Sequence, residues 1–327
     1  MRVRSLDIYV TYRCNLRCTH CFVGDNLSTA QSFAQDSLAR LITGARRMWG
    51  TEEVTFLGGE PTLHPGIVDA VLLAGASGLR VRIVTNGLHG FRSFVERFEG
   101  APLPVVGISI DGASPGTHDA VRGRKSFERT MENVERARQR GYRLFGIMSV
   151  SRANAGDVGD VLALCDRLGF GWVNIHYVSN RGFATPEMVM PIPEWRALAA
   201  EIERRSAGLR LDVRLERTFV PAGAHRRYCA IRSADNLLFL PDGRVFMCPM
   251  FIDVPGAHSF TWTGSELLDR SGAATERALG ETRSAVHCPA MRHVNRQLEA
   301  DARASGLEIS CVLEKTRLGG GLVLDEK

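Results

Sequence analysis

Hydrophobic and polar positions in the first half of the chain follow two alternating periods. Short runs rich in valine, isoleucine and aromatic residues occupy 6–10, 54–57, 81–85, 105–110, 144–150 and 172–178. Apolar and polar residues alternate only in part within these runs, which is typical of parallel strands covered on both faces. Between them, apolar residues recur at helical spacing, for example over 38–45, 127–137 and 157–168. The order predicts six successive β-α units.

Six β-α units predict a parallel sheet that curls into part of a barrel. We therefore expect an α/β fold with a partial (β/α)6 TIM-like barrel over residues 1–190, open on one side because a closed barrel needs eight units. A linking helix and connector are expected over 191–224. The alternation of strand and helix patterns ends before residues 225–327, where we expect a small α+β domain that covers the open side of the barrel. Within it, a β-hairpin is predicted with its turn at Asp242-Gly243.

Composition excludes several classes of protein. The chain has 327 residues, of which 44% are hydrophobic and 24% charged, so it is neither collagen-like nor largely disordered. It has no apolar run of about 18 residues and no secretory signal, so we expect a cytoplasmic protein without a membrane partner. The net charge is +5, and all but three of the 41 basic residues are arginines. Because these arginines are scattered, no nucleic-acid partner is predicted.

The eight cysteines suggest bound metal. In a reducing compartment such a set more often holds metal than forms disulfides. Cys14, Cys18 and Cys21 have the spacing C-x3-C-x2-C directly after the first predicted strand. Three thiolates on one loop can hold three irons of a 4Fe–4S cluster and leave the fourth iron open. From these residues alone a zinc site stays open as the alternative, although His20 is poorly placed between two ligands.

With Phe22 directly after the last cysteine, this motif resembles the radical S-adenosylmethionine (radical SAM) superfamily. Further matches follow later predicted strands, and the resemblance spans about residues 5–180: Gly58, Gly59, Glu60, Ser109 and Asp111, with looser matches at Arg122, Ser149 and Asn154. The resemblance implies SAM as cofactor, held at the open iron and cleaved to a 5′-deoxyadenosyl radical that abstracts hydrogen. It also implies a flavodoxin- or ferredoxin-type reductant.

The resemblance implies roles for two of these motifs. The Gly-Gly-Glu segment would hold the amino group of the SAM methionine moiety. Ser109 and Asp111 would supply polar contacts to the SAM ribose.

The later cysteines resemble the auxiliary-cluster domains called SPASM when they hold two clusters and twitch when they hold one. Gly243 precedes Cys248 in the G-x4-C signature, and the four candidate ligands of one auxiliary 4Fe–4S cluster are Cys229, Cys248, Cys288 and Cys311. The last two lie farther apart than the close pair usual in that family. A zinc ribbon or buried thiols are the alternatives. Cys165 lies in an apolar helical pattern and is expected to be a core thiol.

Candidate substrate residues end the sixth predicted strand. His176 and Tyr177 could contact substrate or remove a proton, and strand alternation turns only one of them into the barrel. If all four later cysteines are ligands, oxidation is favoured. If Cys248 is not a ligand, its thiol could return a hydrogen atom and the result would be epimerisation.

We expect an oxidoreductase of dehydrogenase or epimerase type. Its substrate would be a small polar molecule of the sugar, aminoglycoside or cyclitol type, in natural-product or antibiotic biosynthesis, because no peptide-recognition domain precedes the triplet. One alternative is a maturase that cross-links, epimerises or oxidises a ribosomal peptide. Another is a non-enzymatic iron–sulfur electron-transfer protein, which would have no use for the SAM motifs.

Overall fold

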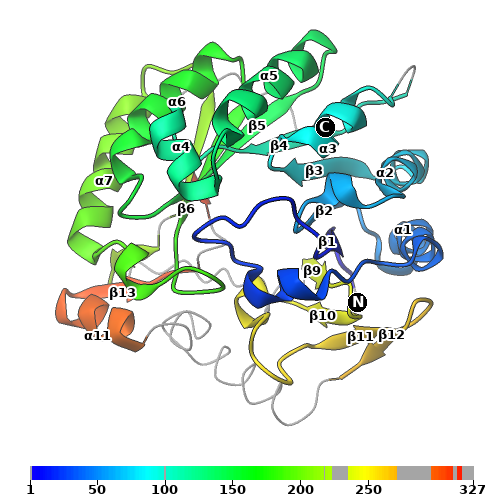
Figure 1. Ribbon diagram of the computed structural model, residues 1–327. Helices are drawn as coiled ribbons and strands as arrows, with labels where there is room; N and C mark the ends of the chain where they lie inside the picture. The colour runs from blue at the N-terminus through cyan, green and yellow to red at the C-terminus, as the bar shows by residue number, and fades with distance from the viewer. Residues whose placement is uncertain are drawn as a thin grey trace.

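A computed structural model describes residues 2–98, 101–216, 218–222, 235–270, 296–311 and 315–318. Its central feature is a sheet of 12 strands in the order β12-β11-β10-β9-β1-β2-β3-β4-β5-β6-β7-β14 (Figure 1). The six predicted strands are all present and pair in parallel: β1 (Ser5–Thr11), β2 (Glu53–Gly58), β3 (Arg80–Thr85), β4 (Val105–Ser109), β5 (Leu144–Val150) and β6 (Trp172–Tyr177). The α/β fold with a partial barrel is confirmed.

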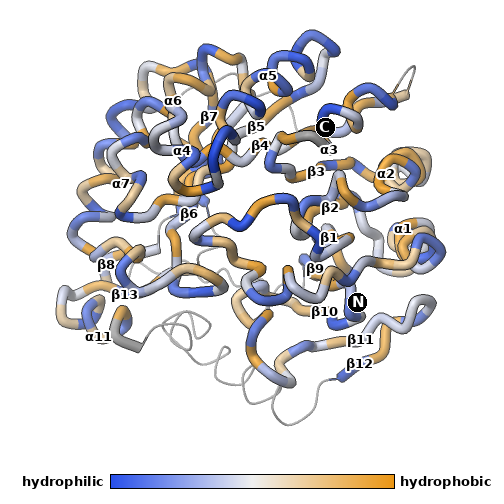
Figure 2. The backbone as a smooth tube through the Cα atoms, in the orientation of Figure 1, coloured by the Kyte–Doolittle hydropathy of each residue, from blue (hydrophilic) through white to orange (hydrophobic). Residues whose placement is uncertain are grey.

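Helices connect these parallel strands and cover the outer face of the sheet. They are α1 (Gln35–Trp49), α2 (Ile67–Ala76), α3 (His89–Val95), α4 (Pro115–Arg122), α5 (Ser126–Gln139), α6 (Val158–Arg167) and α7 (Ile192–Ser206). Single 3-10 turns lie at Gly24–Thr29, Pro61–Leu63, Ala155–Asp157, Pro186–Met188 and Pro249–Phe251. Hydrophilic and hydrophobic residues alternate along the helices, as expected for a layer that packs on the sheet with one side (Figure 2). Among the described residues, no helix is long and apolar enough to cross a membrane.

A seventh parallel strand extends the barrel beyond the six units that the sequence predicts. Helix α7 crosses over to β7 (Asp212–Glu216), which pairs in parallel with β6. This stretch falls in the segment expected to be a connector. Val213 and Leu215 are fully buried, but the residues between them and on either side are charged. A search for apolar runs does not find such a strand.

The C-terminal segment continues the barrel sheet at both of its edges. Strand β9 (Asn236–Phe239) pairs in parallel with β1, and β14 (Lys315–Leu318) pairs antiparallel with β7. The predicted hairpin is formed by β9 and β10 (Arg244–Phe246), with Gly243 at φ +86° in the turn. The remaining elements are β8 (Phe219–Pro221), β11 (Phe260–Trp262), β12 (Leu267–Asp269), α11 (Arg296–Ala304) and β13 (Leu307–Ile309).

The two faces of the curled sheet differ in chemistry. On β5, Gly146 faces helix α6, where an added Cβ would lie 3.3 Å from the Cys165 sulfur. The next outward residue, Met148, is fully buried. Ser149 points the other way and pairs in register with His176 of β6. We call this inner side the lumen, and it is where parallel barrels place functional side chains.

Candidate active site

The three N-terminal cysteines lie on the loop that leaves the carboxyl end of β1. All three are half-buried. The loop after β6 lies directly against it, because the N–H of Phe183 donates to the Cys21 carbonyl at 2.9 Å. The N–H of Thr19 donates to the Val121 carbonyl of α4, also at 2.9 Å. The loop is therefore fixed at its far end by two other strand-end connections.

The loop after β2 fixes the near end of the cysteine loop. The N–H of Gly59 donates to the Thr11 carbonyl and that of Glu60 to the Arg13 carbonyl, each at 2.8 Å. Gly58 has φ +149°, and a Cβ on it would meet the Thr11 carbonyl oxygen. A Cβ on Gly59 would meet the Arg13 carbonyl oxygen. Two glycines are needed here because two backbones touch.

The donor set fits an iron–sulfur cluster better than a single metal ion. Within the described part of the chain, no three His, Cys, Asp or Glu side chains are grouped so that they could hold one metal ion. A structural zinc site usually has four protein ligands, whereas this loop supplies three thiols. In a cubane each thiolate binds its own iron, so three separated sulfurs are the suitable arrangement. Burial raises the pKa of Cys14 to about 12, and a thiolate there needs a cation beside it.

Two hydrogen-bond donors approach the sulfurs. The N–H of Leu16 lies 3.4 Å from the Cys14 sulfur, and Nη1 of Arg122 lies 3.9 Å from the Cys18 sulfur. Burial raises the pKa of Cys18, and the guanidinium of Arg122 opposes that shift. Hydrogen bonds and charges of this kind stabilise cysteine ligands and set the reduction potential of a cluster.

Glu60 is engaged by the protein itself. Its carboxylate is almost fully buried, and Oε1 accepts hydrogen bonds from the Thr62 N–H, the Thr62 hydroxyl and the Thr85 hydroxyl at 3.1, 2.5 and 2.7 Å. Oε2 accepts from the N–H of Asn86 at 2.8 Å. A carboxylate has about four acceptor sites, so these donors occupy its capacity. Glu60 therefore ties the end of β2 to the end of β3.

Asp111 is the centre of a second network, at the end of β4. Burial alone would raise its pKa, but Arg122 and His20 hold it below the usual range. Nε of Arg122 donates to Oδ2 at 2.6 Å, and the N–H of Ser149 donates to Oδ1 at 2.9 Å. Nδ2 of Asn154 donates to the Asp111 and Ser149 carbonyls, each at 3.0 Å.

This network joins β4 and β5 to the cysteine loop through Arg122. The predicted residues at these strand ends are therefore brought together, and Ser109 is buried just before them on β4. The loop after β2 and the segment after β4 thus contact the cysteine loop directly, and the end of β5 reaches it through Asp111 and Arg122. The SAM contacts expected from the sequence stay proposals: Gly58, Gly59, Glu60, Ser109, Asp111, Arg122, Ser149 and Asn154.

The pairing of Arg122 with Asp111 gives a first prediction. An Arg122→Met variant leaves a buried carboxylate without its cation, so we expect the free energy of unfolding to fall by about 3–5 kcal/mol. The double variant Arg122→Met/Asp111→Asn removes the charge as well, and we expect most of the loss to be recovered. Urea denaturation measures both. Equal losses in the single and double variants would contradict the pairing.

His176 and Tyr177 lie on opposite faces of β6. The Tyr177 hydroxyl donates to the Met190 carbonyl at 2.7 Å, and its ring packs edge-on against Trp195 of α7. His176 points into the lumen, where Nδ1 lies 2.6 Å from Oε1 of Glu216 and Nε2 lies 3.3 Å from Nζ of Lys315. Of the two residues, His176 is therefore the one placed for substrate contact, and we retain it as a proposal.

The later cysteines are described only in part. Cys229 and Cys288 lie outside the described residues, whereas Cys248 and Cys311 are both buried. Arg181, in the loop after β6, donates from Nη2 to the Met250 carbonyl at 2.6 Å. That loop also contacts Cys21 through Phe183. One short segment therefore contacts both the N-terminal cysteine loop and the Cys248 region.

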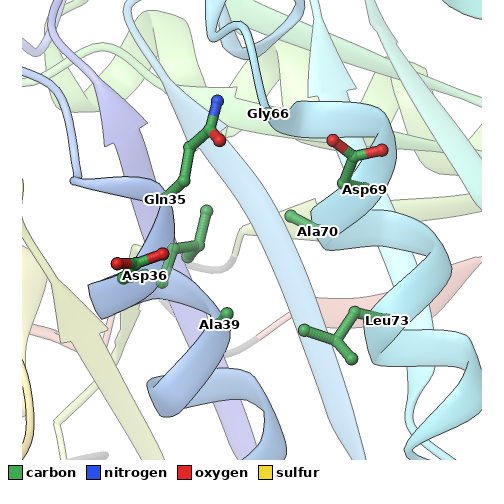
Figure 3. A pocket seen from close by; sticks show the side chains of 8 residues that line it. Gln35, Asp36, Ala39, Gly66, Asp69, Ala70 and Leu73 are labelled. Atoms are coloured by element: carbon green, nitrogen blue, oxygen red, sulfur yellow. The ribbon is translucent and has the colours of Figure 1, made fainter.

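A pocket on the outside of the barrel is separate from this site. It lies between α1 and α2 (Figure 3) and is lined by Gln35, Asp36, Leu38, Ala39, Gly66, Asp69, Ala70 and Leu73. None of the predicted site residues lines it. Its lining includes the carboxyl groups of Asp36 and Asp69.

The comparisons agree with the geometry. Residues 8–165 match the family described as the Radical SAM superfamily. Residues 8–165 thus carry a radical SAM domain, and this family implies a 4Fe–4S cluster and SAM as cofactors.

Two curated relatives and one solved structure illustrate the kinds of protein that this chain is similar to. The chain is 32% identical over 156 residues to the GTP 3′,8-cyclase of Mannheimia succiniciproducens, covering 46% of each protein. It is 32% identical over 161 residues to the mycofactocin maturase MftC of Mycobacterium ulcerans, covering 49% of this chain and 43% of that protein. The chain thus spans just under half the length of these relatives.

The structure of Streptococcus suis SuiB bound to S-adenosylmethionine has a TM-score of 0.64 to this fold. The sequence identity is 16%, and the match covers 78% of this chain and 62% of that chain. At this identity the likeness concerns the fold.

Several residues of the site were not found from the sequence. Thr85 and Asn86 hold Glu60, and they follow an apolar strand in the way that strand-end site residues do. Glu216 and Lys315 lack such a signal, because each belongs to a short strand whose lumen face is charged. Only strand pairing places them beside His176.

Proposed function

We propose that this radical SAM enzyme oxidises a hydroxyl-bearing carbon of a small polar substrate, of the sugar, aminoglycoside or cyclitol type, using an auxiliary iron–sulfur cluster as oxidant. The observation that carries the proposal is the polar lumen beside the cysteine loop, where His176 lies with Glu216 and Lys315. Bound SAM and its cluster supply abstraction of a hydrogen atom from carbon. A flavodoxin or ferredoxin is the proposed reductant.

The residues of the chain have separate tasks in this proposal. Cys14, Cys18 and Cys21 hold the SAM-binding cluster, and Arg122 stabilises the Cys18 thiolate. Loss of a hydrogen atom from an alcohol carbon leaves one electron and one hydroxyl proton to be removed before a ketone forms. We assign removal of the hydroxyl proton to the lumen side chains that include His176, because a base beside the substrate can accept the proton directly, without bulk water.

The auxiliary cluster is proposed at the four later cysteines. Its support is the burial of Cys248 and Cys311 in a segment whose strands pair with β1 and β7 at the two edges of the barrel. Burial favours a ligand or packed thiol over an exposed reactive one. The contact between Arg181 and Met250 brings the Cys248 region to the loop after β6.

Iron content and product identity test the proposal together. Anaerobic reconstitution should give about eight irons per chain, and Cys248→Ala should lower this to about four if Cys248 is a ligand. With SAM and dithionite, wild-type protein should form 5′-deoxyadenosine and a ketone from myo-inositol or glucosamine. Four irons in the wild type would contradict the auxiliary cluster.

Other products would redirect the assignment. An intact second cluster in Cys248→Ala, with loss of an epimerised product, would identify Cys248 as a hydrogen donor. Turnover of a peptide in place of the polyols would support a maturase, since the names of the relatives cover both a GTP cyclase and maturases.

A further inference from the structure

Three strands bring an acid, an imidazole and an amine into one line across the lumen. Glu216 ends β7, His176 lies near the end of β6, and Lys315 begins β14, where it pairs in register with Glu216. The side chain of Glu216 is 5% exposed and that of His176 31% exposed. Lys315 is half-buried, and its charge interacts with Asp7 of β1 and Arg82 of β3.

The hydrogen bonds fix the orientation of the imidazole. Oε2 of Glu216 accepts from the N–H of Tyr177 at 2.9 Å, and Oε1 faces Nδ1 of His176 at 2.6 Å. A carboxylate accepts only, so Nδ1 carries the proton and Nε2 presents a lone pair. That lone pair faces Nζ of Lys315 at 3.3 Å. Lys315 is thus the donor in this contact.

Lys315 differs from the other cations that face it. Arg214 is paired with Asp212 at 3.0 Å, and Arg82 with Glu53 at 3.3 Å. Within the part of the chain that the structure describes, Nζ of Lys315 has His176 as its hydrogen-bonding partner and forms no ion pair within 4.0 Å. In its neutral form, the amine of Lys315 can donate one N–H to His176 and still present its lone pair to another group in the lumen.

The electrostatic surroundings favour the neutral amine. Burial lowers the pKa of Lys315, Arg214 and Arg82 lower it further, and Glu216 and Asp7 oppose the shift. The charged and titratable groups that face it are therefore His176 on β6, two residues of β7, and one residue each on β1 and β3. A lysine whose pKa is lowered in this way is better able to serve as a general base.

Building on the proposed oxidation, we infer that Lys315 is the catalytic base that binds the hydroxyl group of the substrate and takes its proton, while His176 and Glu216 position it. SAM bound at its cluster would supply the radical that takes the hydrogen atom from carbon. The hydroxyl proton goes to the amine, which becomes ammonium, and an iron–sulfur cluster, as oxidant, would take the remaining electron. The substrate class is then an alcohol whose hydroxyl is on the carbon that loses hydrogen.

Trace acetylation tests the state of Lys315 without turnover. The chain has three lysines, Lys125, Lys315 and Lys327, and exposed Lys125 is an internal reference. On reconstituted protein treated with acetic anhydride and read by mass spectrometry, Lys315 should titrate at lower pH than Lys125. Glu216→Gln removes a negative charge and should lower the midpoint of Lys315 further. Lys315 titrating together with Lys125, without response to Glu216→Gln, would overturn the inference.

A turnover assay is the second part of the test. For a polyol that the wild type oxidises, Lys315→Met should lower the yield of ketone per 5′-deoxyadenosine about 100-fold, within the usual range for a general base. Lys315→Arg should not recover it, because arginine stays protonated. Methylamine should restore part of it in Lys315→Ala. Lys125→Met is the matched control and should behave as wild type.

The acetylation and turnover measurements distinguish failure of the inference about Lys315 from failure of the proposed function. If the wild type forms ketone and Lys315→Met forms as much, the inference is overturned and the proposed oxidation stands. If no polyol is oxidised, the proposed function fails. The acetylation midpoint then still decides whether Lys315 is the low-pKa amine that the inference requires.

Discussion

Replacing Cys18 with alanine is expected to abolish formation of 5′-deoxyadenosine. Cys18 is the middle residue of the triplet, and its sulfur is the one that Arg122 approaches. Without it, two thiolates remain for a cluster that needs three protein ligands to leave one iron open for SAM. We expect the iron content after reconstitution to fall by about four per chain. Iron and sulfide analysis, followed by an assay of SAM cleavage under dithionite, measures both effects.

Cys165→Ala is the matched control for this experiment. Its thiol is fully buried under β5, and burial raises its pKa to about 12, as for Cys14. Cys165 lies in α6, on the outer face of the sheet and away from the cysteine loop, so the cost of its loss is packing, about 1–2 kcal/mol. We expect full iron content and normal SAM cleavage in this variant. A Cys18→Ala protein that keeps its iron and cleaves SAM would exclude the triplet as the site.

The cysteine loop was predictable because its chemistry is local in sequence. Three thiols within eight residues of one another, directly after an apolar run, need no tertiary information to be placed on one strand end. The loops at Gly58-Gly59-Glu60 and at Asp111 were found for the same reason, since each follows its own strand. Parallel pairing then brings all these ends to one edge of the sheet.

The use that the protein makes of these residues was not predictable. Glu60 was expected to hold the SAM amino group, yet its carboxylate is filled by donors from Thr62, Thr85 and Asn86. Sequence spacing places a carboxylate at a strand end, but it does not show which neighbouring N–H and hydroxyl groups will satisfy it. The contact of this loop with SAM, through its main chain and Glu60, stays a prediction.

The lumen was the least predictable part of the site. Glu216 lies 40 residues from His176, and Lys315 lies 139 residues from it. Both are on short strands with charged inward faces, and charged residues normally indicate solvent exposure. Here the curvature of the sheet encloses them, so the polar face is internal and can serve substrate chemistry.

The Gly59→Ala variant tests whether backbone contact between two loops maintains the SAM site. An added Cβ would overlap the Arg13 carbonyl oxygen and would lie 2.7 Å from that of Tyr12. Both atoms are backbone of the segment that leads into the triplet, so no side chain can turn away to make room. We expect the loop after β2 and the cysteine loop to separate, with loss of the hydrogen bond from Gly59 to Thr11. SAM cleavage should fall about 10–100-fold, as when other supports of metal ligands are removed.

Gly75→Ala supplies the comparison because it makes the same chemical change where space is open. Gly75 lies in α2, and among the described residues nothing lies within 4 Å of the position that an added methyl group would take. Alanine there should stabilise the helix by about 0.5–1 kcal/mol. Iron content, SAM affinity by equilibrium dialysis and the rate of 5′-deoxyadenosine formation should change in Gly59→Ala and not in Gly75→Ala. Normal SAM affinity in Gly59→Ala would mean that the two loops do not need their close approach. The cysteine loop would then be held by its contacts to Val121 and Phe183, which lie on the other side of it.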